Sequence, residues 1–161
     1  MVAFDSQAVS ASGLQKLDPV NVAILRALSE DARMTMSALG RRVGLSAPAV
    51  TERVQRMEAA GVIRGYRLDV DPAAVGLPVA AWVRIKPGPG QLVKIAELAA
   101  AIPEVVECHR ITGEDCFLAK VHVGGVTELE TVLDRFLLFG QTVSSIVQSS
   151  PVPPRGVPLP S

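Results

Sequence analysis

The residues best suited to chemistry are arginines gathered between positions 41 and 67. This stretch contains six arginines and only two glutamates, although the whole chain has equal numbers of basic and acidic residues and no net charge. The arginines are Arg41, Arg42, Arg53, Arg56, Arg64 and Arg67. Guanidinium groups concentrated on a small surface attract the phosphates of nucleic acids. The stretch therefore predicts a phosphate-contacting surface, with the solvated face of a helix as the alternative.

A group of three predicted helices must position these arginines. Apolar periodicity, N-terminal caps and stop signals predict helices over about 19–29, 36–43 and 47–60. Each is preceded by a side chain that can cap it, namely Asp18, Thr35 and Ser46. Gly44 supplies the left-handed residue that ends the second helix. Two helices joined by a short turn and preceded by a third predict a helix-turn-helix domain.

The third helix has two distinct faces. Val50, Val54 and Met57 recur at helical spacing, so they are predicted to face the core. At about 100° per residue, the opposite face carries Pro48, Thr51, Glu52, Gln55 and Arg56. Of these, the Thr, Glu, Gln and Arg side chains are of types that reach base edges and phosphates. Arg53 lies on the flank, where a phosphate contact and a structural brace to Glu58 are equally consistent with the sequence.

The C-terminal half follows a different pattern. Alternation at 66–70 predicts a half-buried strand that could serve as a wing or as the link between the helix-turn-helix and the rest of the chain. From 78 onward the order strand, helix, strand, strand, helix, strand predicts a ferredoxin-like βαββαβ domain, so the fold class is α+β. The predicted layout is a disordered arm at 1–16, a winged helix-turn-helix domain at 17–70, a linker at 71–77, a second domain at 78–150 and a proline-rich tail at 151–161.

Metal and catalytic sites are not predicted. Cys108, His109, Cys116 and His122 are ligand types, but Cys116 and His122 lie roughly 20 Å apart along one strand. Placing Ile111 opposite Cys116 in the hairpin pairs Cys108 near Ala119, which keeps the two sulfurs apart. The chain has no Ser-His-Asp or Cys-His arrangement with usable spacing. We therefore expect no metal, no disulfide, no cofactor and no enzymatic activity.

The location expected from the sequence is the cytoplasm. No segment approaches the roughly 18 consecutive apolar residues of a membrane span. The first residues lack a basic region followed by an apolar run, so they do not resemble a secretory signal. Two cysteines are too few for a disulfide framework and are consistent with a reducing compartment.

Several motifs resemble the Lrp/AsnC family of leucine-responsive, or feast/famine, regulators. In the first half these are LD-x-x-(D/N)-x-x-IL at 17–25 and ALGRRVGLSAPAVTERVQRMEAAGVIRGY at 38–66. In the second half they are PEVVECHRITGEDCFL at 103–118 and FGQTVSSIVQSSPV at 139–152. A helix-turn-helix alone is weak evidence of function. Its pairing with a βαββαβ domain in this order is a specific signal.

The resemblance implies a ligand and an assembly. Members dimerise through the C-terminal sheet, often form tetramers or octamers, and bind amino acids in the C-terminal domain, called RAM. Carried over to this chain, the effector-binding residues are Gly113, Glu114, Asp115 and Cys116 in a loop, with Thr142, Ser144 and Ser145 on the last strand. Backbone N–H groups at the glycine would hold a carboxylate, and an acidic side chain the ammonium. Alternatively, Gly113 only makes a tight hairpin and the acids are solvated. Cys116 stands where the family often has an acid, a role that Asp115 could take one position earlier.

We therefore predict a homo-oligomeric transcription regulator that binds double-stranded DNA and an amino-acid effector. Paired recognition helices would enter successive major grooves about 34–36 Å apart. Arg42, Arg53 and Arg56 are expected to contact phosphates, with Arg64 as a further candidate. Gln55, Thr51 and the helix start at Ser46 and Ala47 are expected to read bases. The alternatives are an enzyme like the siroheme decarboxylases, which share this architecture, and a ligand-binding partner subunit with a silent DNA-binding domain.

Overall fold

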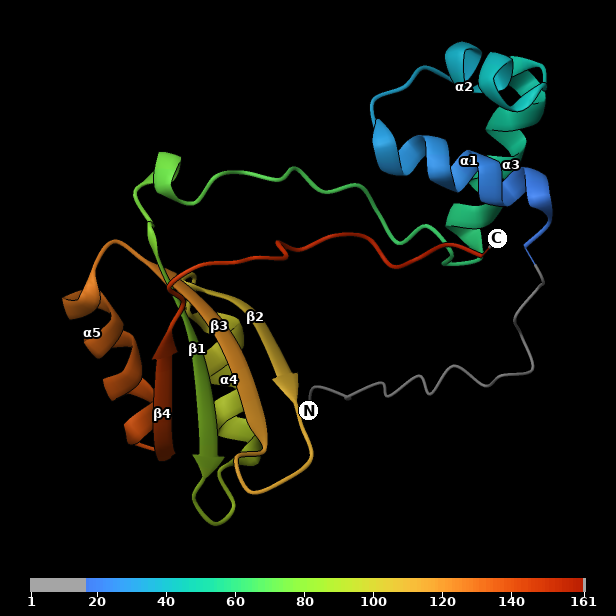
Figure 1. Ribbon diagram of the computed structural model, residues 1–161. Coiled ribbons are helices and arrows are strands. Elements are labelled where there is room, and N and C mark those ends of the chain that lie inside the picture. The colour runs from blue at the N-terminus through green and yellow to red at the C-terminus, as the bar shows by residue number, and fades with distance from the viewer. Residues whose placement is uncertain (1–16, 161) are drawn as a thin grey trace. The chain divides into compact units, whose positions relative to one another are not determined.

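The computed structural model describes residues 17–160 of the chain (Figure 1). The disordered arm predicted at 1–16 lies outside the described residues. The chain divides into two compact units. The first, here called the helical unit, comprises the described residues up to Leu68 together with the last residues from Pro154. The second, the sheet unit, comprises Asp69–Pro153.

Three helices form the helical unit, as predicted. They are α1 (Pro19–Glu30), α2 (Met36–Val43) and α3 (Ala47–Ala59). The predicted N-caps are confirmed, because the side chains of Asp18, Thr35 and Ser46 accept hydrogen bonds from backbone N–H groups of their first turns. Gly44 ends α2 with φ 73°, a left-handed conformation that costs glycine little.

One apolar cluster holds the three helices together. Ile24 of α1, Leu39 of α2 and Val50 of α3 are completely buried at its centre. Val54 and Met57 join them, so the predicted inward face of α3 is confirmed. Close approach near the α2–α3 turn depends on Gly40, where a Cβ atom would lie 2.6 Å from the Leu45 carbonyl oxygen. This packing fixes the direction in which α3 presents its other faces.

The sheet unit has the predicted βαββαβ order. Its elements are β1 (Val79–Pro87), α4 (Leu92–Ala101), β2 (Val105–Arg110), β3 (Phe117–Val123), α5 (Val126–Leu137) and β4 (Gly140–Ile146). The strands lie in the order β2-β3-β1-β4, and every neighbouring pair is antiparallel. The predicted hairpin register is confirmed, because Cys108 lies opposite Ala119.

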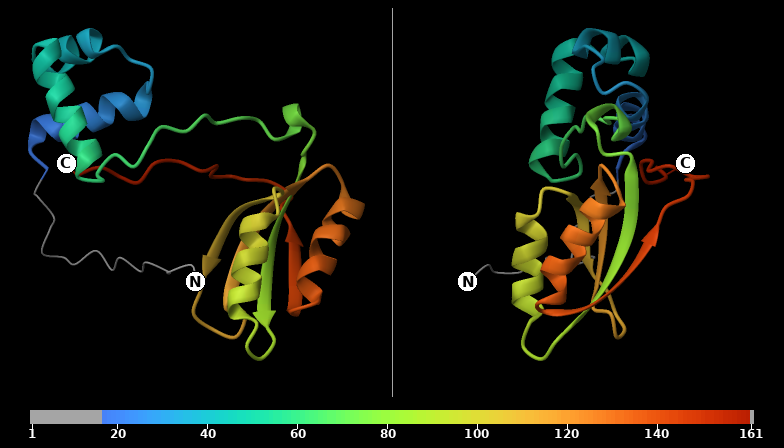
Figure 2. Two further views of the ribbon diagram at one scale, coloured as in Figure 1. Left: turned by 180° about the vertical axis from the view of Figure 1, so that it is seen from behind. Right: turned by 90° about the vertical axis from the view of Figure 1, so that its left-hand side faces the viewer.

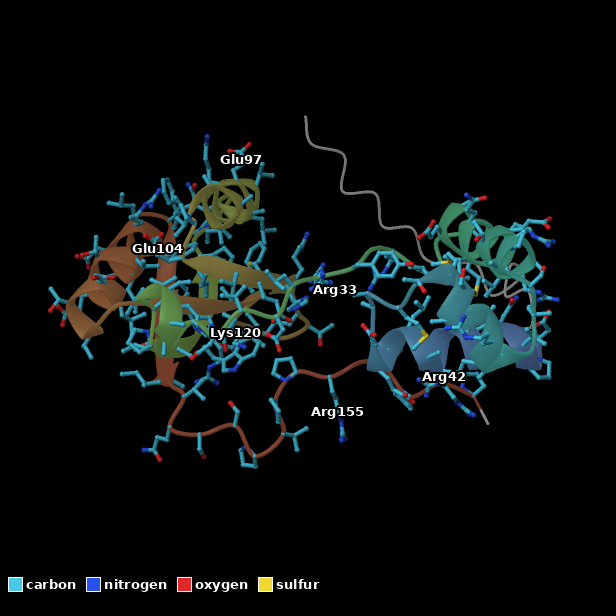
Figure 3. All side chains as sticks on the ribbon, turned by 90° about the horizontal axis from the view of Figure 1, so that it is seen from above. Arg33, Arg42, Glu97, Glu104, Lys120 and Arg155 are labelled. Carbon is cyan, nitrogen blue, oxygen red and sulfur yellow. The ribbon has the colours of Figure 1, made fainter. Side chains whose placement is uncertain are left out.

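The two faces of this sheet differ. Helices α4 and α5 both pack on one face (Figure 2), where Val83, Phe117 and Phe136 form part of the buried core. The opposite face, here called the open face, has no helix of the sheet unit on it. Its residues include the register pairs Trp82–Lys120 and Ala80–His122. The Nζ atom of Lys120, labelled in Figure 3, lies 6.0 Å from the centroid of the Trp82 ring.

The strand predicted at 66–70 is wrong. Residues 64–71 contain no strand or helix, and Leu68 is 87% exposed instead of half-buried. The alternating pattern is present in the sequence, but no strand of the described chain lies beside it to complete a hydrogen-bonded ladder. The wing that this strand could have formed is therefore also absent from the described residues. A short 3₁₀ helix, η2 (Ala73–Val75), lies in the predicted linker.

The C-terminal tail contains no regular secondary structure. Residues 147–160 form neither helix nor strand. Within the helical unit, Nη2 of Arg26 on α1 donates a hydrogen bond to the Pro160 carbonyl oxygen at 2.6 Å. Among the described residues, no helix is both long and apolar enough to cross a bilayer.

Candidate nucleic-acid interface and effector site

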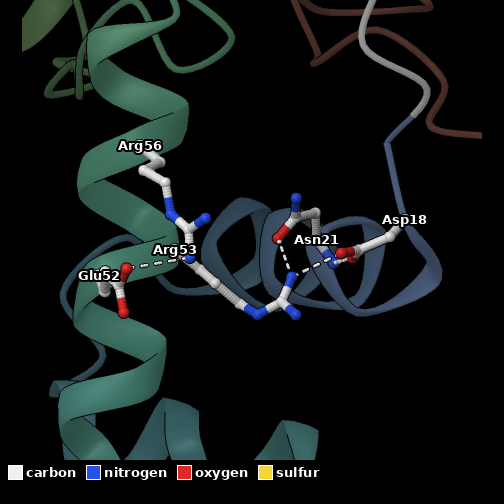
Figure 4. A network of polar contacts seen from close by, with 5 residues as sticks. All are labelled: Asp18, Asn21, Glu52, Arg53 and Arg56. Carbon is white, nitrogen blue, oxygen red and sulfur yellow. Dashed lines mark hydrogen bonds and ion pairs between the residues drawn. The ribbon is translucent and has the colours of Figure 1, made fainter.

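Four exposed side chains define the outward face of α3. They are Pro48, Glu52, Gln55 and Arg56. Nη2 of Arg56 lies 3.1 Å from Oε1 of Glu52, one helical turn earlier (Figure 4). The two side chains are 70% and 68% exposed, so solvent screens this pair and it adds little to stability. The face therefore combines an amide, a carboxylate and a guanidinium, all accessible to a ligand.

Arg53 has a different environment from Arg56. Its Nη1 atom donates to Oδ2 of Asp18 at 2.6 Å and to Oδ1 of Asn21 at 3.0 Å (Figure 4). Its side chain is only 29% exposed. The hydrogen bond from Arg53 is the main reason that the pKa of Asp18 is lowered, with help from the Asn21 backbone N–H. Arg53 thus ties α3 to the start of α1, which is the geometry of a brace.

The partner of this brace differs from the predicted one. The sequence suggested Glu58, which instead accepts a hydrogen bond from the Tyr66 hydroxyl at 3.0 Å. Both burial and that carboxylate raise the pKa of Tyr66. Asp18 and Asn21 lie more than thirty positions before Arg53, so helical spacing on α3 gave no signal for this contact.

Arg42 also has a carboxylate partner. It donates to Glu30 at the end of α1, and both side chains are exposed. Arg42, Arg53 and Arg56, all predicted to contact phosphates, are therefore each paired with an acid. Within residues 17–160, no ion pair is found for Arg41, Arg64 or Arg67. These three arginines of the basic stretch can therefore bind an anion without first leaving an acidic partner.

The hydroxyl groups near the start of α3 are occupied by the helix itself. Oγ of Ser46 accepts from the Ala49 N–H, and Oγ1 of Thr51 donates to the Ala47 carbonyl oxygen at 2.8 Å. Thr51 is only partly exposed. With Gln55 it lines a hollow of about 330 Å³ on the flank of α3, shared with residues of α1, α2 and Tyr66. Of the predicted base-reading side chains, Gln55 alone is both exposed and polar without a helix partner.

The loop at 112–116, between β2 and β3, is a tight turn. The Ile111 N–H donates to the Cys116 carbonyl oxygen at 2.8 Å and closes it. Gly113 has φ 113°, a conformation that side chains rarely adopt. Cys116 has φ 54° and is the one non-glycine residue among those described with positive φ. Strain of this kind is common in ligand-binding loops.

Both acids of this loop are paired with basic residues of β1. Oε2 of Glu114 lies 2.9 Å from Nζ of Lys86, and Oδ2 of Asp115 lies 3.8 Å from Nε of Arg84. The hydrogen bond with Lys86 lowers the pKa of Glu114, and the same bond raises the pKa of Lys86. Arg84 and Lys86 were not predicted at this site, because only the register of the sheet brings them beside the loop.

The predicted residues of β4 do not gather around the loop. Thr142 lies opposite Ile85, which also pairs with Phe117 at the end of the loop, so Thr142 is at the loop end of the sheet. Ser145 lies opposite Trp82 on the open face, whereas Ser144 lies opposite Val83 and faces the other way. Within one chain, these three residues and the loop do not form a single cluster.

The cysteines and histidines form no metal centre in the part of the chain that the structure describes, where no group of three or more His, Cys, Asp or Glu could hold an ion. Cys108 and Cys116 are both free thiols. Nε2 of His109 lies 2.5 Å from Oε1 of Glu107. The Nδ1 atom of His122 is buried and has no hydrogen-bond partner among the described residues.

Comparison with known proteins matches both units. Residues 17–58 match the AsnC-type helix-turn-helix domain, and residues 80–157 match the Lrp/AsnC ligand binding domain. The HTH-type transcriptional regulator LrpC of Bacillus subtilis is 32% identical over 134 residues, which cover 83% of this chain and 93% of the relative. The HTH-type transcriptional regulator LrpA of Mycobacterium tuberculosis is 37% identical over 122 residues, covering 75% and 81% of the two chains.

Solved structures agree with the sequence matches. LrpC of B. subtilis superposes with a TM-score of 0.80, covering 83% of this chain and 96% of that chain. The feast or famine regulatory protein Rv3291c of M. tuberculosis, complexed with L-methionine, gives a TM-score of 0.83 at 34% identity and covers 89% and 99%. The helix-turn-helix unit, the antiparallel sheet unit and these matches establish that the chain belongs to the Lrp/AsnC family of transcriptional regulators.

Proposed function

We propose that the chain binds specific DNA as a homo-oligomer and that an amino acid or a related small effector changes its DNA affinity or its oligomeric state. The observation that carries the proposal is the outward face of α3. Gln55, Glu52 and Arg56 are exposed there, while the opposite side of the helix is completely occupied by the core. A helix of this kind, in a family of transcriptional regulators, fits the major groove.

Binding of DNA requires exchange of ion-pair partners. Arg56 and Arg42 leave Glu52 and Glu30 for phosphates, and Gln55 reads a base together with the N-terminal turn of α3 at Ser46–Pro48. Arg53 acts as a brace that holds α3 at its angle to α1, which is a change from the phosphate contact expected from the sequence. Because the arginine–phosphate contacts are electrostatic, the affinity for DNA falls steeply as the salt concentration rises.

The effector site is built on loop 112–116. Backbone N–H groups around Gly113 hold the carboxylate of an amino acid, and Asp115 or Glu114 exchanges its pairing with Arg84 or Lys86 for the ammonium group. The Rv3291c structure was solved as a complex with L-methionine, which supports amino acids as the ligand class for this chain. Thr142 lies at the loop end of the sheet, whereas Ser144 and Ser145 lie farther along β4, so residues of β4 complete the site through a neighbouring subunit.

The open face of the sheet is the surface that a second copy covers. Trp82 and Lys120 lie on it, together with the unpartnered Nδ1 atom of His122. Trp82 is only partly covered within one chain, and contact with another subunit would bury more of its ring. Dimers joined there assemble into tetramers or octamers, and the effector acts by binding one assembly better than another. As a DNA-binding regulator, the chain acts in the cytoplasm.

The test is a binding titration on the DNA upstream of the protein's own gene, at two salt concentrations and with a panel of amino acids. The proposal predicts a salt-sensitive shift that one amino acid strengthens or weakens. Gln55→Ala and Arg56→Ala are expected to weaken binding, whereas Arg135→Ala, an exposed change on α5, leaves it unchanged. Intact binding by both α3 variants would contradict the proposed interface. No binding under any condition would favour the partner-subunit or enzyme alternatives.

A further inference from the structure

A carboxylate lies at the centre of the surface that is proposed to meet DNA. Glu52 is on the side of α3 opposite Val50, Val54 and Met57, and its side chain is 68% exposed. It lies in the first half of the helix, the part that contacts base edges when a recognition helix enters the major groove. Its partner is Arg56, on the same helix (Figure 4).

Once Arg56 has turned to a phosphate, an acidic side chain in this position can affect DNA binding in two ways. The duplex carries about one negative charge per 1.7 Å of its axis, so a carboxylate near the backbone is repelled. This repulsion increases when Arg56 turns toward a phosphate and no longer offsets the charge of Glu52. The carboxylate is compensated only if a hydrogen-bond donor of a base faces it. Glu52 therefore either weakens binding to every sequence or selects a base with a donor.

Base chemistry identifies the donor. In the major groove, only the N4 amino group of cytosine and the N6 amino group of adenine donate hydrogen bonds. Adenine places the acceptor N7 beside its amino group, and a carboxylate has only acceptors, so its second oxygen would face N7 unfavourably. Cytosine itself presents no acceptor in that groove, so N4 has only the O6 atom of the paired guanine beside it, whereas adenine N6 lies between its own N7 and the O4 atom of the paired thymine. A carboxylate consequently prefers cytosine, whereas an amide, which can donate as well as accept, suits adenine.

We propose that Glu52 is a specificity-determining residue that accepts a hydrogen bond from the N4 amino group of a cytosine in the recognised DNA. This inference rests on the proposed DNA-binding function and adds a base identity to it. Arg56 is the only charged partner of the Glu52 carboxylate found in the described residues, so Glu52 is free to change partner when Arg56 turns toward a phosphate.

Glu30 provides a matched control within the same unit. It also pairs with an arginine, Arg42, but it belongs to α1 and is not on the outward face of α3. Removing the charge of Glu30 changes the net charge of the helical unit by the same amount as removing the charge of Glu52. Glu30→Gln is therefore expected to change affinity for all sequences by one common factor and to leave base preference unchanged.

The experiment is selection of binding sites from a library of randomised duplexes by the full-length protein, run in parallel for wild type, Glu52→Ala, Glu52→Gln and Glu30→Gln. The wild type and Glu30→Gln should enrich motifs with the same invariant cytosine. Glu52→Ala should lose that preference, by about tenfold in relative affinity, and should bind random duplex more tightly. Glu52→Gln should change the preferred base from cytosine to adenine.

Two results would overturn the inference, and they have different meanings. If wild type and Glu52→Ala enrich the same motif, Glu52 only repels DNA; the inference then fails while the proposed function stands. If wild type enriches no motif, specific DNA binding itself fails, and the inference fails with it. Thermal unfolding of each variant checks the fold. Because Glu52 and Glu30 are both exposed, all three variants are expected to unfold like the wild type.

Discussion

The helical unit and the sheet unit hold their candidate binding residues in different ways. On α3 the exposed polar residues follow the regular spacing of a helix whose other side is locked by Val50, Val54 and Met57. In the sheet unit the candidate residues lie on a turn with two positive-φ positions, and their charges are balanced by β1, some thirty residues earlier. The two faces of a regular helix can thus be read from local sequence, whereas the charge partners of a turn lie on distant strands.

The hydrophobic cores of the two units also differ in how far apart in the sequence their residues lie. The helical unit is held by one cluster drawn from three consecutive helices. The core of the sheet unit joins β1, β3 and both helices across the whole domain. Because each cluster is confined to its own unit, damage to one core is expected to leave the other unit folded.

The largest predicted effects test this independence. Phe136→Ala removes a ring with no exposed surface from the sheet unit, and Ile24→Ala removes an equally buried side chain from α1. We expect Phe136→Ala to destabilise the sheet unit by about 4 kcal/mol and Ile24→Ala to destabilise the helical unit by about 3 kcal/mol. Hydrogen exchange resolved by residue measures each unit separately. Loss of protection in both units from either change would show that they fold as one.

Each unit also contains a glycine at a close approach, and the two are expected to respond differently. A Cβ atom at Gly140 would overlap the Lys86 carbonyl oxygen, and antiparallel pairing of β1 with β4 prevents either strand from moving away. Gly140→Ala should therefore cost about 2 kcal/mol. Gly40→Ala meets the Leu45 carbonyl oxygen but regains roughly 1 kcal/mol of helix propensity, so its net cost should be smaller. Chemical denaturation ranks the two, with Gly156→Ala, where the space is open, as the control.

The two arginines on α3 give a smaller and more local comparison. Arg53→Met breaks the contact with Asp18 and Asn21 and is expected to lower the Tm of the helical unit by a few degrees. Arg56→Met removes only an exposed pair within α3 and should leave the Tm unchanged. At a temperature where both variants are folded, Arg56→Met is expected to weaken DNA binding more than Arg53→Met does. Equal Tm values for the two variants would argue against the brace.

The effect of pH on the helical unit follows from Asp18. Because Arg53 lowers its pKa in the folded chain, the pairing stabilises the unit fully above the ordinary aspartate pKa. This contribution is lost as the pH falls through the lowered folded-state pKa. Asp18→Asn should therefore be less stable than wild type at neutral pH, and the difference should shrink in acid. Chemical denaturation of both proteins at neutral and at acid pH measures this difference in stability. A difference that persists unchanged in acid would contradict the prediction.

The smallest predicted change concerns loop 112–116. Lys86→Gln removes the group that lowers the pKa of Glu114, so that pKa should rise toward its usual value. Stability should not change measurably, because both side chains are substantially exposed. An NMR titration of the Glu114 side chain reports the shift, with Lys94→Gln on α4 as the control. A Glu114 pKa unaffected by Lys86→Gln would show that the pair does not persist in solution.

The sequence predicted what depends on local spacing. Asp18, Thr35 and Ser46 were recognisable as caps, and the order of strands and helices was sufficient for the βαββαβ topology. The strand at 66–70 was wrong because alternation encodes the two faces of a strand but not a neighbouring strand to bond with. The partners of Arg53 were not predictable either, since Asp18 and Asn21 approach it only after the helices pack.

Long-range charge pairing limited the prediction of the candidate effector site. Glu114 and Asp115 were identified, but Lys86 and Arg84 were missed because β1 and the loop are separated by a helix and a strand. Their proximity follows from the register in which Ile85 lies opposite Phe117. A charged residue on a strand has no sequence signal for its partner across the sheet.

The chain has one tryptophan and one tyrosine, and the fold places them in different units. Trp82 lies on the open face of the sheet with Lys120 near its ring, and Tyr66 lies in the helical unit with its hydroxyl bonded to Glu58. Intrinsic fluorescence thus contains two separate signals without any label. Fluorescence excited at a wavelength that only tryptophan absorbs should shift to the blue when the open face becomes covered, because water then leaves the indole ring. Tyrosine absorbance at alkaline pH reports independently on the helical unit.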